Sequence, residues 1–286
     1  MNMMANEMFI DTAQLRASVV SHAKLLGYTP RSRVASQAVL DISFEEVPGG
    51  SNSAMTLPKF TKFTATPLNG TAYSFVTVEQ RVASKNVGGF FNFDSVEIKE
   101  GNPVSYVFTY DAQTNEKQVF VLPDEGVDTS TLSVQVQKSV DNLLLETFEL
   151  ATDSTSVVST APVYYLEENR EGRYQISFGD GILGKALDDG NIVIVSYVVT
   201  SGDAANGIRI FTLSDNPMPG AEVTVTTLTE SSSGSQAETT EQVKFTAPKA
   251  FISQNRAVTK NDYEALIKRN YPYFDSVAVW GGEENV

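Results

Sequence analysis

The residues that most often carry redox, metal and nucleophilic chemistry are scarce in this 286-residue chain. It has no cysteine, which excludes disulfides, thiolate nucleophiles and cysteine-ligated zinc or iron–sulfur sites. It has one histidine, His22, on which any Ser-His-Asp triad would have to be built, yet no G-x-S-x-G nucleophile elbow occurs in the sequence. We therefore expect no catalytic residue, no metal-ligand set and no cofactor.

Long apolar runs and positive charge are also lacking. No stretch approaches the roughly 20 apolar residues of a membrane-spanning helix, and residues 1–11 have neither the basic start nor the apolar core of a signal peptide. Lysine and arginine number 21 against 35 aspartates and glutamates, which gives a net charge of −14. This charge opposes broad attraction to phosphate groups. We therefore predict no nucleic-acid partner and no membrane span.

Paired carboxylates are the remaining route to acid–base catalysis. Such pairs occur at Glu45–Glu46, Glu167–Glu168 and Glu283–Glu284. Neighbouring residues on a strand point to opposite faces, and carboxylate pairs in turns are usually just solvated. A carboxylate-based hydrolase is therefore kept as an alternative function and not as the expected one.

The glycine-rich segment 176–197 raises the question of a nucleotide site. Gly179, Gly181 and Gly184 have the G-x-G-x-x-G spacing of dinucleotide-binding loops. Such a loop needs a helix after its glycines, so that free N–H groups face the phosphate. Here only Ala-Leu-Asp-Asp and a second glycine turn precede the β-branched run 192–200. The segment therefore favours an antiparallel hairpin without a nucleotide.

Alternation of apolar and polar residues dominates the middle of the chain. Ala38 to Phe44 alternate as a leading strand, and short alternating runs separated by turns continue to about residue 150. Beyond them, Val163–Leu166 and Arg173–Phe178 are predicted to pair as a hairpin. The segment SSSGSQAE at 231–238 is predicted to be a flexible loop or linker.

These patterns predict an α+β fold of β-rich antiparallel sheets with an N-terminal helix and short C-terminal helices. Four consecutive segments are expected. They are an N-terminal helix with the leading strand (1–45), a β-rich domain (46–151), a second β-rich domain (152–230), and an incomplete C-terminal α+β domain with linker, short helices and a strand (231–286).

The N-terminal segment 7–26 is predicted to be an amphipathic helix that Gly27 ends in the C′ position. Its apolar stripe consists of Leu15, Val19 and Leu26. Because such a stripe must be buried, and little of its own domain is expected to cover it, we predict that it contacts a partner.

Two short helices are predicted near the C-terminus. Pro248 suits the first turn of a helix that continues to about Gln254, and Arg256 is expected to pair with a carboxylate or to cap carbonyl groups after it. Thr259, with Asp262 three residues later, resembles a capping box for a second helix. That helix must end before Pro272.

The second of these helices has an apolar face that needs a cover. Residues 276–280 are predicted to form a strand that packs against this face. We expect the segment to serve structure and association. The residues of the apolar face are Tyr263, Leu266 and Ile267.

Several short motifs follow one another in an order that resembles a known family. They lie at 11–20, 27–30, 178–181, 201–207, 255–259, 262–264, 271–272 and 281–284. Taken in order, they resemble the baseplate J-like family of contractile-tail phages. The C-terminal motifs are the most characteristic part, and residues 46–150 are the least diagnostic. Compared with the family pattern, the chain lacks a leading helical portion and stops within a domain, so we expect a partial chain.

The resemblance implies a structural protein of the virion tail baseplate, assembled in the host cytoplasm. Proteins of this kind join neighbouring wedges into a ring and rearrange when the sheath contracts. The implied partners are other baseplate wedge proteins and a second copy of the chain itself, as a homodimer within the wedge ring. The resemblance also implies that the glycine loop is a turn without a nucleotide.

A receptor- or glycan-binding tail module is the first alternative. Such a module needs an exposed aromatic platform. The candidates are Tyr164, Tyr165, Phe90, Phe91 and Trp280.

Overall fold

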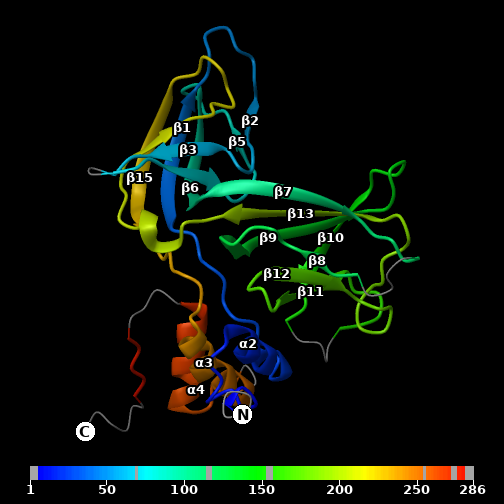
Figure 1. Ribbon diagram of the computed structural model, residues 1–286. Coiled ribbons are helices and arrows are strands. Elements are labelled where there is room, and N and C mark those ends of the chain that lie inside the picture. Colours follow the sequence, from blue (N-terminus) through cyan, green and yellow to red (C-terminus); the bar gives the residue numbers. More distant parts are fainter. Residues whose placement is uncertain are drawn as a thin grey trace. The chain divides into compact units, whose positions relative to one another are not determined.

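A computed structural model describes residues 6–67, 70–113, 118–152, 157–253, 256–271 and 276–280. The chain forms two compact units, each assembled from separated segments (Figure 1). Unit 1 contains residues 1–32, 105–197 and 237–286, and unit 2 contains residues 33–104 and 198–236. This division cuts across the four consecutive segments expected from the sequence, because strands that are distant in the chain pair with one another.

Unit 2 is built on a six-stranded sheet with the order β14-β3-β4-β6-β1-β15. Strand β1 (Gln37–Glu45), next to the edge of this sheet, pairs antiparallel with both β6 (Phe90–Glu100) and β15 (Val223–Ser232). The other elements are β3 (Lys62–Ala65), β4 (Tyr73–Thr77), β14 (Phe211–Leu213), the separate pair β2 (Ala54–Leu57) and β5 (Arg81–Ser84), and the short helix η1 (Gly202–Ala205).

The core of unit 2 follows from the alternation along β1. Ala38, Leu40, Ile42 and Phe44 are all buried, whereas the residues between them are only partly so. Phe44 meets Phe93 edge-on, with ring centroids 5.9 Å apart. The predicted leading strand is therefore confirmed, with one face in the core and the other partly solvated.

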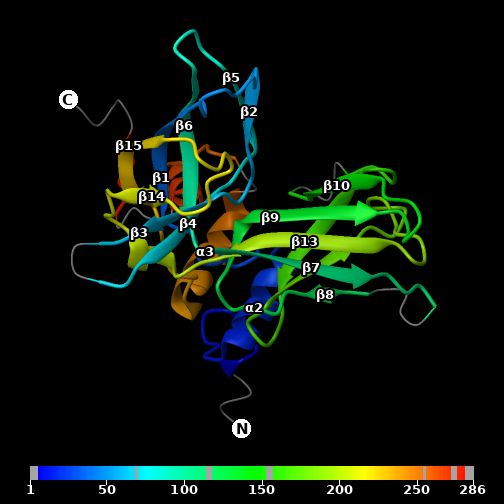
Figure 2. The same ribbon diagram turned by 90° about the horizontal axis from the view of Figure 1, so that it is seen from above.

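Unit 1 contains a seven-stranded sheet with the order β7-β13-β9-β10-β11-β12-β8. Figure 2 shows its long strands β7, β13 and β9 side by side. The pair β10–β11 is parallel, and β11–β12 is the predicted antiparallel hairpin. The strands are β7 (Asn102–Thr109), β8 (Phe120–Val121), β9 (Val127–Gln137), β10 (Leu145–Leu150), β11 (Val163–Glu168), β12 (Tyr174–Phe178) and β13 (Ile192–Val199).

The hairpin predicted across the glycine loop is wrong. The strand after the loop, β13, lies between β7 and β9, whereas β12 lies between β11 and β8. The Asn191 side-chain amide donates a hydrogen bond to the Lys138 carbonyl (2.8 Å), which holds the start of β13 beside the end of β9. Long-range pairing of this kind outweighs the short connection that favoured a hairpin.

Among its described residues, unit 1 also contains the helices α2, α3 and α4, and the first of them is shorter than the predicted N-terminal helix. Helix α2 spans Arg16–Leu25, whereas the segment before it forms turns. Gly27 has φ +69° directly after the C-cap Leu26, so the predicted helix end is confirmed.

Helix α3 (Thr240–Ser253) begins eight residues before the predicted first turn at Pro248, which lies inside it. The reason is a reciprocal cap that the prediction overlooked. The Gln242 N–H donates to Thr239 Oγ1 (3.3 Å), and the Thr239 N–H donates to Gln242 Oε1 (2.8 Å).

Helix α4 (Lys260–Asn270) begins at the predicted capping box and ends before Pro272, as expected. Residues 276–280, however, do not form the predicted strand, and no described strand pairs with them. A segment with the alternating pattern of a strand forms a strand only when a neighbouring strand accepts and donates its backbone hydrogen bonds.

The segment 231–238 is not the flexible linker that its composition suggested. Ser231 is buried and belongs to β15, and its hydroxyl donates to the Ala205 carbonyl (2.5 Å). Ser235 pairs with Val34, and the side chain of Glu238 is buried. The Ser231 hydroxyl also accepts a hydrogen bond from the Ile208 N–H (2.8 Å), so it satisfies two buried backbone groups, which composition alone cannot reveal.

The predicted α+β class, with β-rich antiparallel sheets, an N-terminal helix and short C-terminal helices, is confirmed. Within the described ranges, no helix is both long enough and apolar enough to cross a membrane.

Candidate functional site

The most elaborate arrangement of side chains in unit 1 lies where the helices meet the sheet. On α2, Val19 and Ala23 are fully buried, and they pack with Val243 and Ala247 of α3. The predicted stripe is therefore divided. Val19 is covered by α3 of the same chain and not by a partner, Leu26 is partly buried against the same cluster, and Leu15 is 50% exposed at the N-cap of α2.

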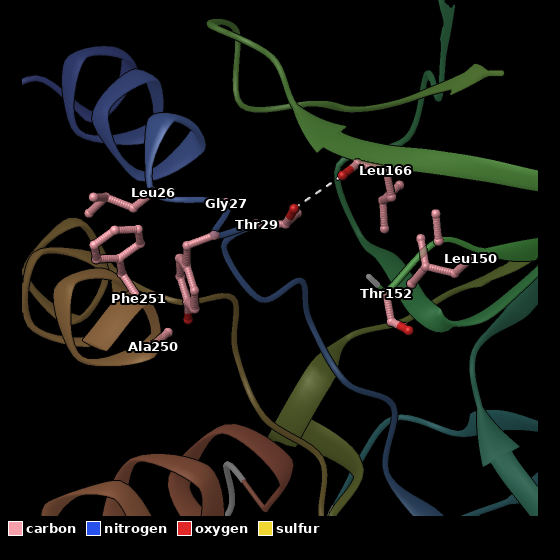
Figure 3. Close-up of a pocket in the computed structure, with 10 residues that line it drawn as sticks. Leu26, Gly27, Thr29, Leu150, Thr152, Leu166, Ala250 and Phe251 are labelled. Atoms are coloured by element: carbon pink, nitrogen blue, oxygen red, sulfur yellow. Dashed lines mark hydrogen bonds between the residues drawn. The ribbon is translucent and has the colours of Figure 1, made fainter. Parts of the chain in front are cut away.

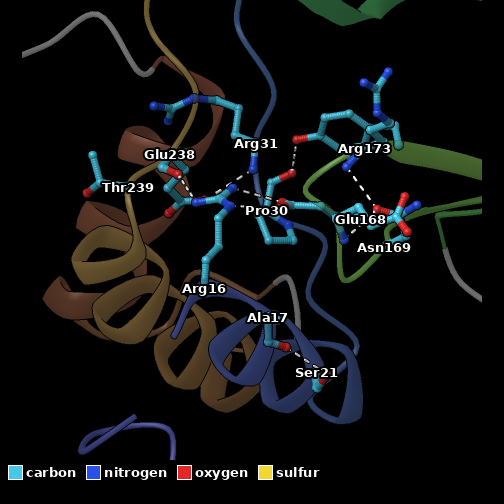
Figure 4. Close-up of polar contacts among 12 residues, drawn as sticks. Arg16, Ala17, Ser21, Pro30, Arg31, Glu168, Asn169, Arg173, Glu238 and Thr239 are labelled. Atoms are coloured by element: carbon cyan, nitrogen blue, oxygen red, sulfur yellow. Dashed lines mark hydrogen bonds and ion pairs between the residues drawn. The ribbon is translucent and has the colours of Figure 1, made fainter. Parts of the chain in front are cut away.

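A bidentate ion pair fastens α2 to the end of strand β11 (Figure 4). Arg16 Nε donates to Glu168 Oε1 (2.6 Å), and Arg16 Nη2 donates to Glu168 Oε2 (2.8 Å). Glu168 retains 1% of its side-chain exposure and Arg16 33%. Burial lowers the pKa of Arg16, but the hydrogen bond and the charge of Glu168 outweigh this effect, so that the pKa is raised overall.

The same arginine reaches the segment that precedes α3. Arg16 Nη1 donates to the Glu238 carbonyl (2.7 Å). The Glu238 carboxylate in turn accepts hydrogen bonds from the Tyr28 hydroxyl (2.7 Å) and the Arg31 N–H (3.1 Å). Tyr174 completes the group by donating to the Pro30 carbonyl (2.9 Å), and its burial raises the pKa of the phenol. Three segments that are distant in sequence therefore meet at Arg16.

The N-terminal end of α2 is capped from outside the helix. Leu15 cannot cap it with its side chain, but Glu7 Oε1 accepts hydrogen bonds from the N–H groups of Gln14 (2.9 Å) and Leu15 (3.4 Å). The hydrogen bonds from Gln14 and then Ser18 lower the pKa of Glu7. His22 Nε2 lies 2.9 Å from the Glu7 carbonyl oxygen, so the histidine tethers the preceding turn to the helix surface.

The C-terminal candidates lie around α4. Arg256 is exposed, and its backbone N–H, not its side chain, bonds to the Ser253 carbonyl (2.7 Å). Tyr263 is exposed, whereas Leu266 and Ile267 are partly exposed. The expected strand at 276–280 is not there to cover these residues. The structure therefore brings together Val19 and Leu26 among the candidates and leaves the C-terminal apolar residues accessible.

The capping box of α4 gives a direct test of its stability. The Thr259 N–H donates to Asp262 Oδ2 (2.8 Å) and, with the Thr259 hydroxyl, holds the pKa of Asp262 below its ordinary value. We expect Thr259→Ala to destabilise unit 1 by about 1 kcal/mol in urea denaturation. The stability that the ionised Asp262 side chain contributes is fully present above the ordinary aspartate pKa. It is lost as the pH falls through the lowered pKa of Asp262 in the folded protein. Equal stability of the variant and the wild type at neutral pH would contradict the cap.

A pocket of about 420 Å³ opens where α2, α3 and the ends of β10 and β11 meet (Figure 3). The Thr29 hydroxyl donates to the Leu166 carbonyl (3.1 Å) at its wall. None of the lining residues is a carboxylate, histidine, lysine or arginine, so the pocket offers no acid or base for a hydrolase. They are Leu26, Gly27, Tyr28, Thr29, Leu150, Ala151, Thr152, Leu166, Ala250 and Phe251.

The carboxylate pairs are not arranged as acid and base. Glu168 is used by Arg16, and Glu167 by Lys24 (2.6 Å). Glu46 pairs with Lys85 (2.7 Å). The third pair, at 283–284, lies outside the described residues. Within the described ranges, no group of three or more metal-ligating side chains occurs.

The glycine loop is closed on itself. Asp180 Oδ1 accepts hydrogen bonds from the N–H groups of Ile182 and Leu183 (2.9 Å each), which are donors that a phosphate would need. The Gly181 N–H is taken by the Gly184 carbonyl (3.0 Å), and no helix follows the loop. This arrangement lacks the strand–loop–helix geometry of a nucleotide site.

The aromatic platform required by a receptor-binding module is not assembled. Tyr164 and Phe91 are buried in the cores of different units. Burial raises the pKa of Tyr164 to about 12. Tyr165 is partly buried, and among the other candidates Phe90 and Trp280 are exposed.

Arg16, Glu168 and Glu238 were missed as site residues by the sequence analysis. Glu168 was recognised only as one of a carboxylate pair. A charged residue on the first turn of a mostly apolar helix is a weak signal, and its partners lie 152 and 222 residues away. No spacing rule connects positions so far apart.

The two large sheets and the helices held against the second of them define a β-rich α+β protein. In sequence it is similar to a baseplate wedge protein. It is 24% identical over 295 residues to the baseplate wedge protein gp6 of Enterobacteria phage T4, a match that covers 93% of this chain. The chain spans 42% of the length of that relative. This match confirms the resemblance to contractile-tail baseplate proteins.

No family model matches the chain. Among solved structures, a similar chain occurs in the cryo-EM structure of the anti-feeding prophage (AFP) baseplate, 6-fold symmetrised. The two chains share 14% identity over 90% of this chain and 46% of the other. Their TM-score of 0.29 is too low for this match to bear on fold or function.

Proposed function

We propose that this chain is a non-enzymatic structural component of a contractile-tail phage baseplate, located in the virion tail, where protein–protein contacts join neighbouring wedges. The observation that carries the proposal is the similarity to gp6, which extends along nearly the whole chain and is not confined to one motif. The predominance of ordered sheet and the involvement of the charged pairs in holding segments together support it.

The helical part of unit 1 is the proposed contact surface with a second copy of the chain. Many large apolar side chains are exposed there, more than isolated surface residues would explain. Its exposed or partly exposed members are Leu15, Leu25, Phe245, Phe251, Ile252, Val258, Tyr263, Leu266 and Ile267.

Leu15→Asp tests this surface with little disturbance to the fold. Leu15 is 50% exposed at the N-cap of α2, a position where aspartate is favoured. The gain from aspartate at the N-cap is offset by repulsion from the neighbouring Glu7 carboxylate, so we expect stability to change by less than about 1 kcal/mol. We expect at least about tenfold weaker self-association, because an apolar contact is replaced by a charge. Sedimentation velocity across a concentration series measures the association.

Leu228→Asp is the matched control, because Leu228 lies on unit 2 and is 49% exposed. Its self-association should equal that of the wild type. Equal loss in both variants, or no loss with Leu15→Asp, would contradict the proposed surface. The wider proposal fails if the wild-type chain is missing from purified baseplates of the particle that encodes it.

A further inference from the structure

Three loops of unit 1 meet at one end of the seven-stranded sheet. They are 138–144 between β9 and β10, 158–162 before β11, and 179–191 between β12 and β13. Lys185, on the third loop, connects that loop to the second loop and to the start of β10. Its N–H donates to the Ala161 carbonyl (2.8 Å), and its Nζ lies 2.5 Å from Glu146 Oε2. In Figure 2, these green and yellow-green loops gather beyond the same ends of β9 and β13.

The first loop presents leucines from a turn that is held in place. The N–H groups of Ser139 and Asn142 each donate to the carbonyl of the other residue (3.5 and 3.3 Å). Asn142 Oδ1 also accepts a hydrogen bond from the Leu144 N–H (3.1 Å). Leu143 and Leu144 are nevertheless 74% exposed. Side chains on a preformed turn lose little conformational freedom when a partner covers them.

The neighbouring loops extend this apolar surface. Val140 lies on the same turn as the leucines, Val158 on the second loop and Ile182 on the glycine loop, and all three are exposed. Together with Leu143 and Leu144 they form what we call the apolar tip. A cluster of exposed aliphatic residues on convergent, hydrogen-bonded loops is typical of a protein-contact site.

The charges around the apolar tip identify what can cover it. Asp141, Asp188 and Asp189 are exposed on these loops. The cations of the same loops are Lys138 and Lys185, and Lys185 is already paired with Glu146. This acidic surround repels nucleic-acid phosphate and anionic lipid, and two copies of the tip would bring like charges together. A surface of opposite charge is complementary to it.

We propose that the apolar tip inserts into an apolar pocket on a different protein, with lysine and arginine residues around the rim of that pocket. The inference rests on the proposed function, since the partner would be a neighbouring baseplate protein. The tip lies on the strand loops, whereas the surface proposed for self-association lies on the helices, so the chain would have two separate contact sites.

Site-specific photocross-linking in purified particles tests the partner. p-Benzoylphenylalanine placed at position 144 should cross-link to a peptide of another protein that contains apolar residues flanked by lysine or arginine, identified by mass spectrometry. The same group at position 228 should not label that peptide. A cross-link to a second copy of this chain, to lipid, or to nothing at all would overturn the proposal.

Two variants test the contribution of the tip to assembly. Leu143→Ser with Leu144→Ser should reduce the copies found in purified baseplates at least about tenfold. Asp141→Lys should also reduce incorporation, and it keeps the leucines in place. Ile210→Ser, at an exposed position of unit 2, is the control and should assemble normally. If either tip variant assembles as the wild type does, the tip inference fails while the proposed function stands; absence of the wild-type chain itself would refute the proposed function.

Discussion

Arg16→Met is expected to destabilise unit 1 by about 2–4 kcal/mol, because it leaves the Glu168 carboxylate charged and unpaired in an almost fully buried position. Removing one partner of a fully buried pair costs roughly 3–5 kcal/mol. The expected value is smaller here because Arg16 retains 33% of its side-chain exposure. Urea denaturation followed by far-ultraviolet circular dichroism, which reports the helices, measures the free energy of unfolding.

Two further variants show whether the loss comes from the buried charge. Arg16→Met combined with Glu168→Leu should recover most of the stability, because no charge then remains buried without a partner. Lys24→Met is the matched control on the same helix. Its ion pair with Glu167 is much more exposed, so its loss should stay below about 1 kcal/mol. If Lys24→Met were as harmful as Arg16→Met, the importance of the buried pair would be contradicted.

Local patterns predicted local structure well. The alternation in β1 identified which residues face the core, because period-two burial is a property of a single strand. The Thr259–Asp262 box and Gly27 identified helix ends for the same reason, since their hydrogen bonds and backbone angles are decided within a few residues. At α3 the stronger Thr239–Gln242 cap was overlooked in favour of Pro248.

Structure that depends on distant residues was not predicted. The position of β13 between β7 and β9 is decided by partners far away in the sequence, and so is the burial of Glu238 in what reads as a linker. The same limit applies to the site. The sequence placed Val19 on an apolar stripe but could not show that α3 covers it, because α3 lies more than 200 residues later in the chain. Leu15 and Tyr263 are exposed, so both are accessible for the contact with a partner that the sequence predicted.

Gly179→Ala is expected to destabilise unit 1 by about 3 kcal/mol or more, because this glycine makes room for backbone and not for a ligand. A β-carbon at position 179 would lie 2.3 Å from the carbonyl carbon of Gly184 and 2.5 Å from the Leu183 oxygen. Backbone cannot rotate away as the end of a side chain can, so the loop would have to open, at a cost at or above the usual range for overpacking. Urea denaturation again measures the loss.

Gly190→Ala separates this packing effect from backbone strain. Gly190 has φ +81° with nothing within 4 Å of an added β-carbon, so alanine there should cost only the roughly 1–2 kcal/mol of a left-handed conformation. The glycine spacing of the loop is then explained by the closeness of residues 179 and 184. A nucleotide role predicts the reverse pattern, in which Gly179→Ala leaves the free energy of unfolding unchanged and abolishes a saturable calorimetric signal with ATP or NAD. The hydrogen bonds that the N–H groups of Ile182 and Leu183 donate to Asp180 favour the first outcome, since they already occupy donors that a phosphate would require.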